Sequence, residues 1–158
     1  MTPSPLVWTA GPDEAVEVAR LFGRFRDWFG RTEPSDEVFL EGAERLIASH
    51  DAEYLLAART RGAEPEGVCQ LRFRWGLWYG APDCLLEDLY VEDAARGAGL
   101  GRALVELALE RASARGCARI ELDVSEENTP ARRLYERFGF ASGQPGMGRD
   151  LLLRRRLP

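Results

Sequence analysis

The chain has 158 residues, 45% of them hydrophobic and 30% charged, and a formal net charge of −5. This length fits one domain with a real core, so we expect residues 1–158 to form a single domain. The acidic charge argues against nucleic acid as a partner, and no apolar run reaches the roughly 18 residues of a membrane helix. Three widely spaced cysteines, a single histidine and no signal-peptide pattern predict a reduced, cytoplasmic protein without a metal site.

Hydrophobic periodicity predicts two helices and four strands in the first half of the chain. In chain order these are a strand at 5–10, helices at 13–29 and from Ser35 to Ile47, and strands at 53–60, 69–77 and 84–91. Glycine and proline predict turns over 61–66 and 80–83. The strand at 69–77 alternates most clearly, with Gln70, Arg72 and Arg74 between apolar residues, so we expect one of its faces to be buried.

The second half predicts alternating helices and strands. They are a helix from about Leu100 to Gly116, a strand at 118–124, a short helix capped by Thr129 with Pro130 in its first turn, and a last strand near 149–156. Hairpins in the first half and helical crossovers in the second indicate an α/β protein with a mixed sheet and helices on both faces.

The stretch RGAGLG at 96–101 stands between an apolar strand and a helix, with glycine at every second position. Such a turn presents several backbone N–H groups, and the helix N-terminus adds partial positive charge, so the site favours an anion such as phosphate. Arg96 and Arg102 add charge beside it. A tight turn that needs glycine only for its backbone conformation is the alternative.

Two common phosphate-binding patterns do not fit this turn. The P-loop pattern is absent, and the dinucleotide pattern that starts at Gly97 and Gly99 requires a third glycine where Arg102 stands. An oxidoreductase with a nucleotide cofactor is therefore a weakened alternative.

The pattern R-x-x-G-x-G after an apolar strand resembles the GNAT superfamily of N-acetyltransferases. The resemblance covers 85–112 and 120–140, including Asn128, Tyr135 and the pair Gly139-Phe140, and the stretch LEDLYV at 86–91 looks like the polyamine and thialysine acetyltransferase branch. It implies a single-domain α/β fold with a mixed, mostly antiparallel sheet of six or seven strands, about four helices, and a splay between the fourth and fifth strands.

The resemblance also implies that acetyl-CoA is the acetyl donor and assigns residues to it. The backbone of Leu89, Tyr90 and Val91 would hold the pantetheine arm, with Asn128 bonding to the same arm. The pyrophosphate would lie against Arg96, Gly97, Ala98, Gly99, Leu100, Gly101 and Arg102. An ordinary sheet strand and a helix cap beside Thr129 are the structural alternatives for the first two assignments.

Acetyl transfer to an amine needs a group that removes a proton and a group that supplies one. By resemblance Tyr135 is the general acid, because an ordinary tyrosine is protonated at neutral pH; a core tyrosine is the alternative. Glu87 is the candidate base, directly or through water. Its neighbour Asp88 would bind the amine or pack on the other face, since only one of two successive residues in a regular strand faces a cleft.

The acceptor site is the least defined part of the sequence. Trp28, Glu33, Trp75 and Asp88 are candidates, because aromatic rings and carboxylates suit an ammonium group; core packing or a dimer contact is the alternative for the aromatic residues. We expect a small-molecule or peptide amine as substrate, without deciding between a polyamine, an amino acid, an antibiotic and a protein N-terminus. A homodimer follows from the resemblance alone. A non-catalytic CoA-binding sensor or partner module is the remaining alternative.

Overall fold

The computed structural model describes residues 4–158, and the chain forms two compact units. The first unit runs to Leu122, and the second runs from Asp123 to Pro158. That the chain is one domain, as its length predicts, stays a prediction. None of the helices within the described residues combines the length and the apolar character that crossing a membrane requires.

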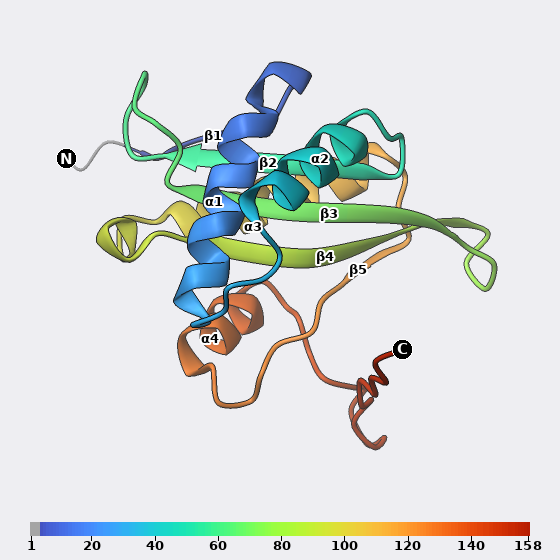
Figure 1. The fold of residues 1–158 in the computed structure, drawn as a ribbon. Coiled ribbons are helices and arrows are strands. Elements are labelled where there is room, and N and C mark those ends of the chain that lie inside the picture. Colours follow the sequence, from blue (N-terminus) through green and yellow to red (C-terminus); the bar gives the residue numbers. More distant parts are fainter. Residues whose placement is uncertain (1–3) are drawn as a thin grey trace. The chain divides into compact units, whose positions relative to one another are not determined.

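Within residues 4–158, the first unit is built on a five-stranded sheet in the order β1-β2-β3-β4-β5 (Figure 1). Its strands are β1 (Leu6–Thr9), β2 (Ala52–Ala58), β3 (Gly67–Gly76), β4 (Ala81–Val91) and β5 (Arg119–Glu121). The first four strands pair antiparallel, and β5 runs parallel to β4. This mixed, mostly antiparallel sheet confirms the predicted fold class.

Local sequence signals explain where the helices begin and end. The described helices are α1 (Ala15–Trp28), α2 (Asp36–Ile47), α3 (Leu100–Ala114) and α4 (Thr129–Arg137), with short 3-10 turns η1 (Pro12–Glu14) and η2 (Asp93–Ala95). The Ser35 side chain accepts a hydrogen bond from the backbone N–H of Val38 and so caps α2. Gly30 follows α1 with a φ of +67°, a conformation that favours glycine.

Each face of the sheet has its own hydrophobic core. One core joins Leu55, Leu71 and Leu86 of the strands to Leu100 and Leu104 of α3. The other joins Tyr54, Leu56, Val68 and Tyr90 of the strands to Val18 and Leu21 of α1 and Ala43 of α2. Figure 1 shows α1 and α2 crossing in front of the sheet, on what we call the α1/α2 face. The expectation of helices on both faces is confirmed.

A β-bulge interrupts β4 at Glu87. Pairing with β3 joins Leu71 to Leu86 and then Gln70 to Asp88, so Glu87 is the extra residue. Side chains beyond a bulge exchange faces relative to a regular strand, because the alternation has a period of two. The prediction of a regularly alternating strand over 84–91 is therefore corrected at Glu87.

β4 and β5 separate after a short stretch of pairing. The residue pairs between them are Asp83–Arg119, Cys84–Ile120 and Leu85–Glu121. Beyond Leu85, β4 continues to Val91 with β3 as its one strand neighbour in the described chain. This is the expected splay, and it leaves one backbone edge of β4 without a strand partner. Such an edge presents N–H and C=O groups to which an extended ligand can bind.

Two boundaries in the sheet differ from the sequence prediction. The turn between β3 and β4 covers residues 77–80 rather than 80–83, and Gly80, with a φ of +58°, ends it. β4 therefore begins at Ala81 rather than at residue 84. β5 is also shorter than the predicted strand at 118–124, because its pairing with β4 ends at Glu121.

The strand expected near 149–156 does not form. These residues are exposed and carry no regular secondary structure, although Leu151, Leu152 and Leu153 have the apolar character of a strand. Apolar residues make a strand only where a neighbouring strand accepts their backbone hydrogen bonds. The sheet within residues 4–158 consequently has five strands rather than six or seven.

Candidate active site

The glycine turn adopts a conformation that non-glycine residues resist. Gly97 and Gly99 have φ values of +81° and +85°, and Gly99 immediately precedes α3. A Cβ added at Gly97 would meet no atom within 4 Å, and one at Gly99 would make only an ordinary contact of 3.8 Å with Pro5. Backbone conformation therefore requires glycine at these two positions, and the space beside them is open. Gly101, in contrast, lies inside the first turn of α3, where glycine costs about 1 kcal/mol relative to alanine.

The N-terminus of α3 has the features of an anion site. No side chain of the described residues caps it, and its first turn contains no acidic residue. The first intrahelical hydrogen bond runs from the N–H of Ala103 to the carbonyl of Gly99, so the preceding N–H groups of the turn point outward without a helical partner. Arg102 stands beside them, 72% exposed and paired with Glu106 at 2.9 Å.

Arg96 links the glycine turn to the end of α1. Its Nε donates to the carbonyl of Val91 at 3.2 Å, and its Nη1 pairs with Asp93 at 2.9 Å. The guanidinium carbon lies 5.3 Å from the ring centroid of Trp28, the last residue of α1. Of the predicted acceptor residues, Trp28 is thus brought to the predicted cofactor turn.

Leu89, Tyr90 and Val91 lie on the part of β4 that has the open edge. Leu89 and Val91 pack against the core under α3, whereas the Tyr90 ring stacks on Phe25 of α1 at 5.0 Å between centroids. All three side chains are thus engaged in packing. A ligand at the open edge would therefore meet their backbone groups, of which the Val91 carbonyl already accepts from Arg96. A part in holding the cofactor arm stays a prediction for these residues.

Glu87 and Asp88 point to the same face of the sheet. Residues directly opposite each other in a β-ladder share a face, and Asp88 is opposite Gln70. The Gln70 side chain in turn donates from Nε2 to Oε2 of Glu87 at 2.9 Å. The expectation that only one of the two carboxylates could face a cleft is therefore wrong, and the bulge is the reason.

Arg72 and Tyr54 complete this group on the α1/α2 face. Arg72 Nη1 lies 3.9 Å from the same Oε2 of Glu87 that Gln70 contacts. Burial, followed by the negative charge of Glu87 and opposed by Arg72, raises the pKa of Tyr54 to about 12. The Tyr54 hydroxyl consequently keeps its proton at neutral pH.

Trp75, another predicted acceptor residue, points away from this group. Trp75 is 65% exposed near the tip of the β3–β4 hairpin, and the alternation of β3 directs it away from the face that Gln70 and Arg72 share. Glu33 lies in the exposed loop between α1 and α2. The structure does not bring Trp75 to Glu87.

The predicted cofactor and acid residues Asn128 and Tyr135 belong to the second unit. Asn128, rather than Thr129, is the N-cap of α4, and its Oδ1 accepts from the N–H of Ala131 at 3.3 Å. The capping prediction for Thr129 is thus wrong by one residue, because the Asn128 side chain reaches the orphan N–H of the first turn. Tyr135 is buried and packs edge-on against Phe140 at 5.8 Å.

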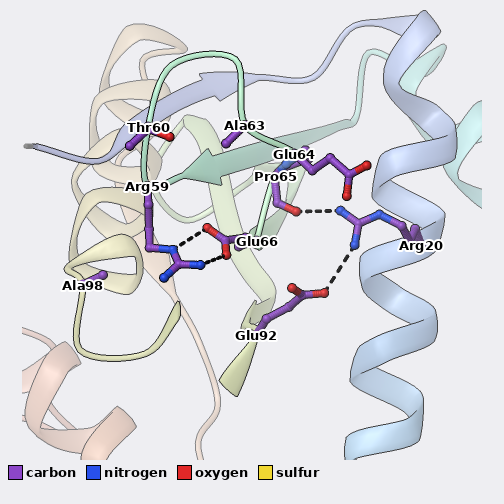
Figure 2. A pocket seen from close by; sticks show the side chains of 9 residues that line it. All are labelled: Arg20, Arg59, Thr60, Ala63, Glu64, Pro65, Glu66, Glu92 and Ala98. Atoms are coloured by element: carbon purple, nitrogen blue, oxygen red, sulfur yellow. Dashed lines mark hydrogen bonds and ion pairs between the residues drawn. The ribbon is translucent and has the colours of Figure 1, made fainter. Parts of the chain in front are cut away.

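A pocket of about 600 Å³ lies beside the glycine turn, with Ala98 of that turn in its lining. Figure 2 shows the side chains that line it. Arg59 reaches Glu66 with two hydrogen bonds, and Arg20 bonds to the carbonyl of Pro65 and to Glu92 (Figure 2). Because both arginines are satisfied by the protein, the pocket carries no free positive charge for a phosphate. The Arg59–Glu66 ion pair closes the β2–β3 loop. Arg20 joins α1 to this loop through the Pro65 carbonyl and to the end of β4 through Glu92.

The comparisons with known proteins agree with this geometry. Residues 17–140 match the model of the acetyltransferase (GNAT) family. The chain belongs to this family. The acetyltransferase is also similar to a solved structure from Arthrobacter sp. FB24 described as an acetyltransferase, with 33% identity, a TM-score of 0.86 and coverage of 96% of each chain.

The curated relatives of this chain carry different acetyltransferase names. A mycothiol acetyltransferase of Beutenbergia cavernae is 34% identical over 149 residues, covering 83% of this chain and 50% of that protein. A thialysine N-epsilon-acetyltransferase of Bos taurus is 33% identical over 81 residues, covering 48% of this chain and 47% of that protein. The chain thus spans about half the length of both relatives. The family generally uses acetyl-CoA as donor, and the family assignment removes the oxidoreductase alternative.

Sequence reasoning on this N-acetyltransferase missed three residues around Glu87. The sequence pattern predicts that Gln70 and Arg72 lie on the polar side of a half-buried strand, and it gives Tyr54 no special role within the strand at 53–60. The missed signal is the hairpin register: counting back from the turn at 77–80 places Gln70 beside the Glu87 region.

Proposed function

We propose that this chain transfers an acetyl group from acetyl-CoA to a primary amine of a small cationic acceptor. The observation that carries the proposal is the β4 bulge, which holds Glu87 on the α1/α2 face where β4 leaves β5. This carboxylate can accept a proton. The open strand edge and the uncapped N-terminus of α3 beside it can bind the acetyl donor.

The donor supplies an acyl group already activated as a thioester. The residues of this chain fit it, because the turn around Gly97 and Gly99 leaves open space and the N-terminus of α3 offers unpaired N–H groups. We assign the pyrophosphate to this turn and the extended arm to the open edge at Leu89 to Val91. By the family resemblance we also assign Asn128 to that arm.

Glu87 is the proposed base. A primary amine is protonated at neutral pH, so it must lose a proton before it attacks. Gln70 and Arg72 both contact Oε2 of Glu87, and Oε1 takes part in neither contact. We therefore propose that Oε1 accepts the proton of the amine, directly or through one water.

Tyr135 is the proposed acid, which gives its hydroxyl proton to the departing thiolate. Phe140 packs against its ring and fixes the direction of the side chain. A fixed donor is more effective than a mobile one, because the reacting geometry is set before the reaction.

The acceptor is proposed to enter over the α1/α2 face. Asp88 supplies a second carboxylate beside Glu87, and Trp28 supplies an exposed ring at the end of α1. Glu33 remains in the proposal as a loop carboxylate, and Trp75 does not, because it points to the opposite face. The thialysine relative is named for an amine acceptor, and we propose a small amine for this chain as well.

Free thiol release from acetyl-CoA tests the proposal across a panel of primary amines. We expect amine-dependent release, with the acetylated amine identified by mass spectrometry. Glu87→Gln should lower kcat about a hundredfold, because general base catalysis contributes at least that much. Glu121→Gln, a strand carboxylate paired with Arg74 and Arg119, is the matched control and should retain activity. Cofactor binding without amine-dependent turnover would contradict the proposal.

We also propose a homodimer, as the family resemblance implies, and a cytoplasmic location, as the three widely spaced cysteines predict. Light scattering of the purified chain should give twice the monomer mass. A monomer at all accessible concentrations would refute the dimer without affecting the proposed chemistry.

A further inference from the structure

We infer that Arg72 binds an anionic group of the acceptor, so that the preferred acceptor carries a carboxylate a few bonds from its reacting amine. The inference rests on the proposed function, since it assumes that the amine is deprotonated at Glu87. It narrows the acceptor from any small amine to an amino acid or a closely related molecule.

The position of Arg72 places a positive charge next to the proposed base. Arg72 and Gln70 are two residues apart on β3 and share the α1/α2 face, about 7 Å apart along the strand. Gln70 contacts Oε2 of Glu87 at 2.9 Å, whereas Arg72 approaches the same atom only to 3.9 Å. Both partners of this ion pair are about two-fifths exposed, at 40% and 41%. A long, exposed ion pair of this kind contributes little to stability and is easily exchanged.

The neighbouring arginines on this face are differently engaged. Arg119 holds Asp83 with two hydrogen bonds of 3.1 and 3.0 Å, and Arg74 bonds to Asp83 and Glu121. Within residues 4–158, the 3.9 Å contact with Glu87 is the one ion pair recorded for Arg72. Arg72 is therefore the arginine of this face with donors to spare for a ligand.

The chemistry of an incoming amine explains why a second charge on the acceptor matters. An ammonium group that binds Glu87 competes with Arg72 for the same carboxylate. Arg72 then faces a positive charge, and a carboxylate on the same molecule relieves this repulsion by accepting the guanidinium in a two-point contact. The acceptor would lie with its amine toward Glu87 and Asp88 and its carboxylate toward Arg72. Tyr54, protonated at neutral pH, is the uncharged polar neighbour of this group.

Matched acceptors that differ only in the anionic group test the inference. Alanine and alaninamide form one pair, and β-alanine and β-alaninamide form another. We compare kcat/KM for the acid with kcat/KM for the amide within each enzyme variant. The acid and the amide differ in amine basicity, but this difference is the same for every enzyme variant. It therefore cancels when the acid-to-amide ratios of two variants are compared. Arg72→Met should lower the acid-to-amide ratio about tenfold or more, the worth of a charge-assisted hydrogen bond.

Two further variants separate charge from local structure. Arg72→Lys should keep part of the preference, because it retains the charge without the planar fork. Arg74→Met removes a neighbouring arginine on the same strand face and should leave the ratio unchanged. Thermal unfolding of all three variants checks that they are folded.

The outcomes distinguish this inference from the proposed function. Equal losses for acid and amide in Arg72→Met would overturn the role of Arg72 while leaving the acetyltransferase chemistry intact. Acetylation of simple diamines together with rejection of all amino acids by the wild type would do the same. If no amine of either kind stimulated thiol release, the proposed function itself would fail, and the inference with it.

Discussion

Gln70 and Glu87 are joined across the β3–β4 pair by a hydrogen bond of 2.9 Å from Nε2 to Oε2. Gln70 is 6% exposed, whereas Glu87 is the bulged residue and much more accessible. A buried amide thus fixes the carboxylate of a residue whose backbone departs from regular strand geometry. This contact sets the direction in which the proposed base points.

Removing the Gln70 amide should impair catalysis more than folding. Gln70→Leu keeps the volume of the side chain but releases Oε2 of Glu87, so we expect kcat to fall about tenfold, the worth of one hydrogen bond to a charged group. KM for acetyl-CoA should not change, because the glycine turn lies elsewhere. Steady-state kinetics measures both constants. A lower melting temperature with an unchanged kcat would show that Gln70 is only structural.

The β4 bulge marks the limit of what the sequence predicts about the site. The pattern of 69–77 and 84–91 predicts two paired strands, and the turn between them limits the register. Counting regularly from the Gly76–Ala81 pair at the observed turn places Gln70 opposite Glu87, whereas the structure pairs Gln70 with Asp88. The turn predicted at 80–83 gives a different register. One inserted residue cannot be read from hydrophobic alternation, and it decides that both carboxylates share a face.

The bounds of the strands are harder to predict from the sequence than the bounds of the helices. The Ser35 cap and the glycines around α1 and α3 are local signals, and they locate those helices to within a few residues. Strand length depends instead on a neighbour. The predicted strand at 149–156 has suitable residues but no strand partner, and β5 ends where its pairing with β4 ends.

Two glycines that flank α3 allow the effect of backbone strain on stability to be distinguished from an effect on CoA binding. Gly99 and Gly116 stand at opposite ends of α3 with φ values of +85° and +72°, and an added Cβ has room at both. Alanine at either position should therefore lower the free energy of unfolding by about 1 kcal/mol. Only Gly99→Ala should also weaken CoA binding, by about tenfold or more, because the backbone of residue 99 would shift within the proposed pyrophosphate-binding turn.

Calorimetric titration with CoA measures this difference, and denaturant unfolding verifies that the two variants are matched in stability. Equal CoA affinities for Gly99→Ala and Gly116→Ala would show that the turn needs glycine for its conformation alone. The pyrophosphate would then have to be placed elsewhere.

A buried ion pair under α3 predicts the acid sensitivity of the fold. Glu53 of β2 accepts two hydrogen bonds from Arg111 at 2.8 Å and one from Arg115 at 2.9 Å. Burial alone would raise the pKa of Glu53, but Arg111 and then Arg115 outweigh it and hold that pKa below its ordinary value. A lowered carboxyl pKa stabilises the folded state above the unfolded-state value and loses this contribution as the pH falls through the folded-state value.

Glu53→Gln should therefore lower the free energy of unfolding by about 2 kcal/mol at pH 7, because it leaves two partly buried guanidinium groups without their carboxylate. The difference from the wild type should shrink as the pH falls below about 4.5. Urea unfolding at several pH values measures it. A difference that stayed constant down to pH 3 would mean that packing, rather than the charge of Glu53, is responsible.

The role of Tyr135 can be separated from its packing within the second unit. Tyr135→Phe removes the hydroxyl but keeps the edge-on contact with Phe140. We expect a loss of stability of no more than about 1 kcal/mol, the worth of one hydrogen bond, and a kcat at least about a hundredfold lower, as for the loss of a general acid. Phe140→Leu is the converse variant: it weakens the ring contact and should lower stability by about 1 kcal/mol. It should lower kcat only about tenfold, because the hydroxyl is kept while its direction is less fixed. Steady-state kinetics and thermal unfolding of the two variants give four values. If Tyr135→Phe lost stability and kept its turnover, Tyr135 would be a core residue and the proton for the thiolate would have another source.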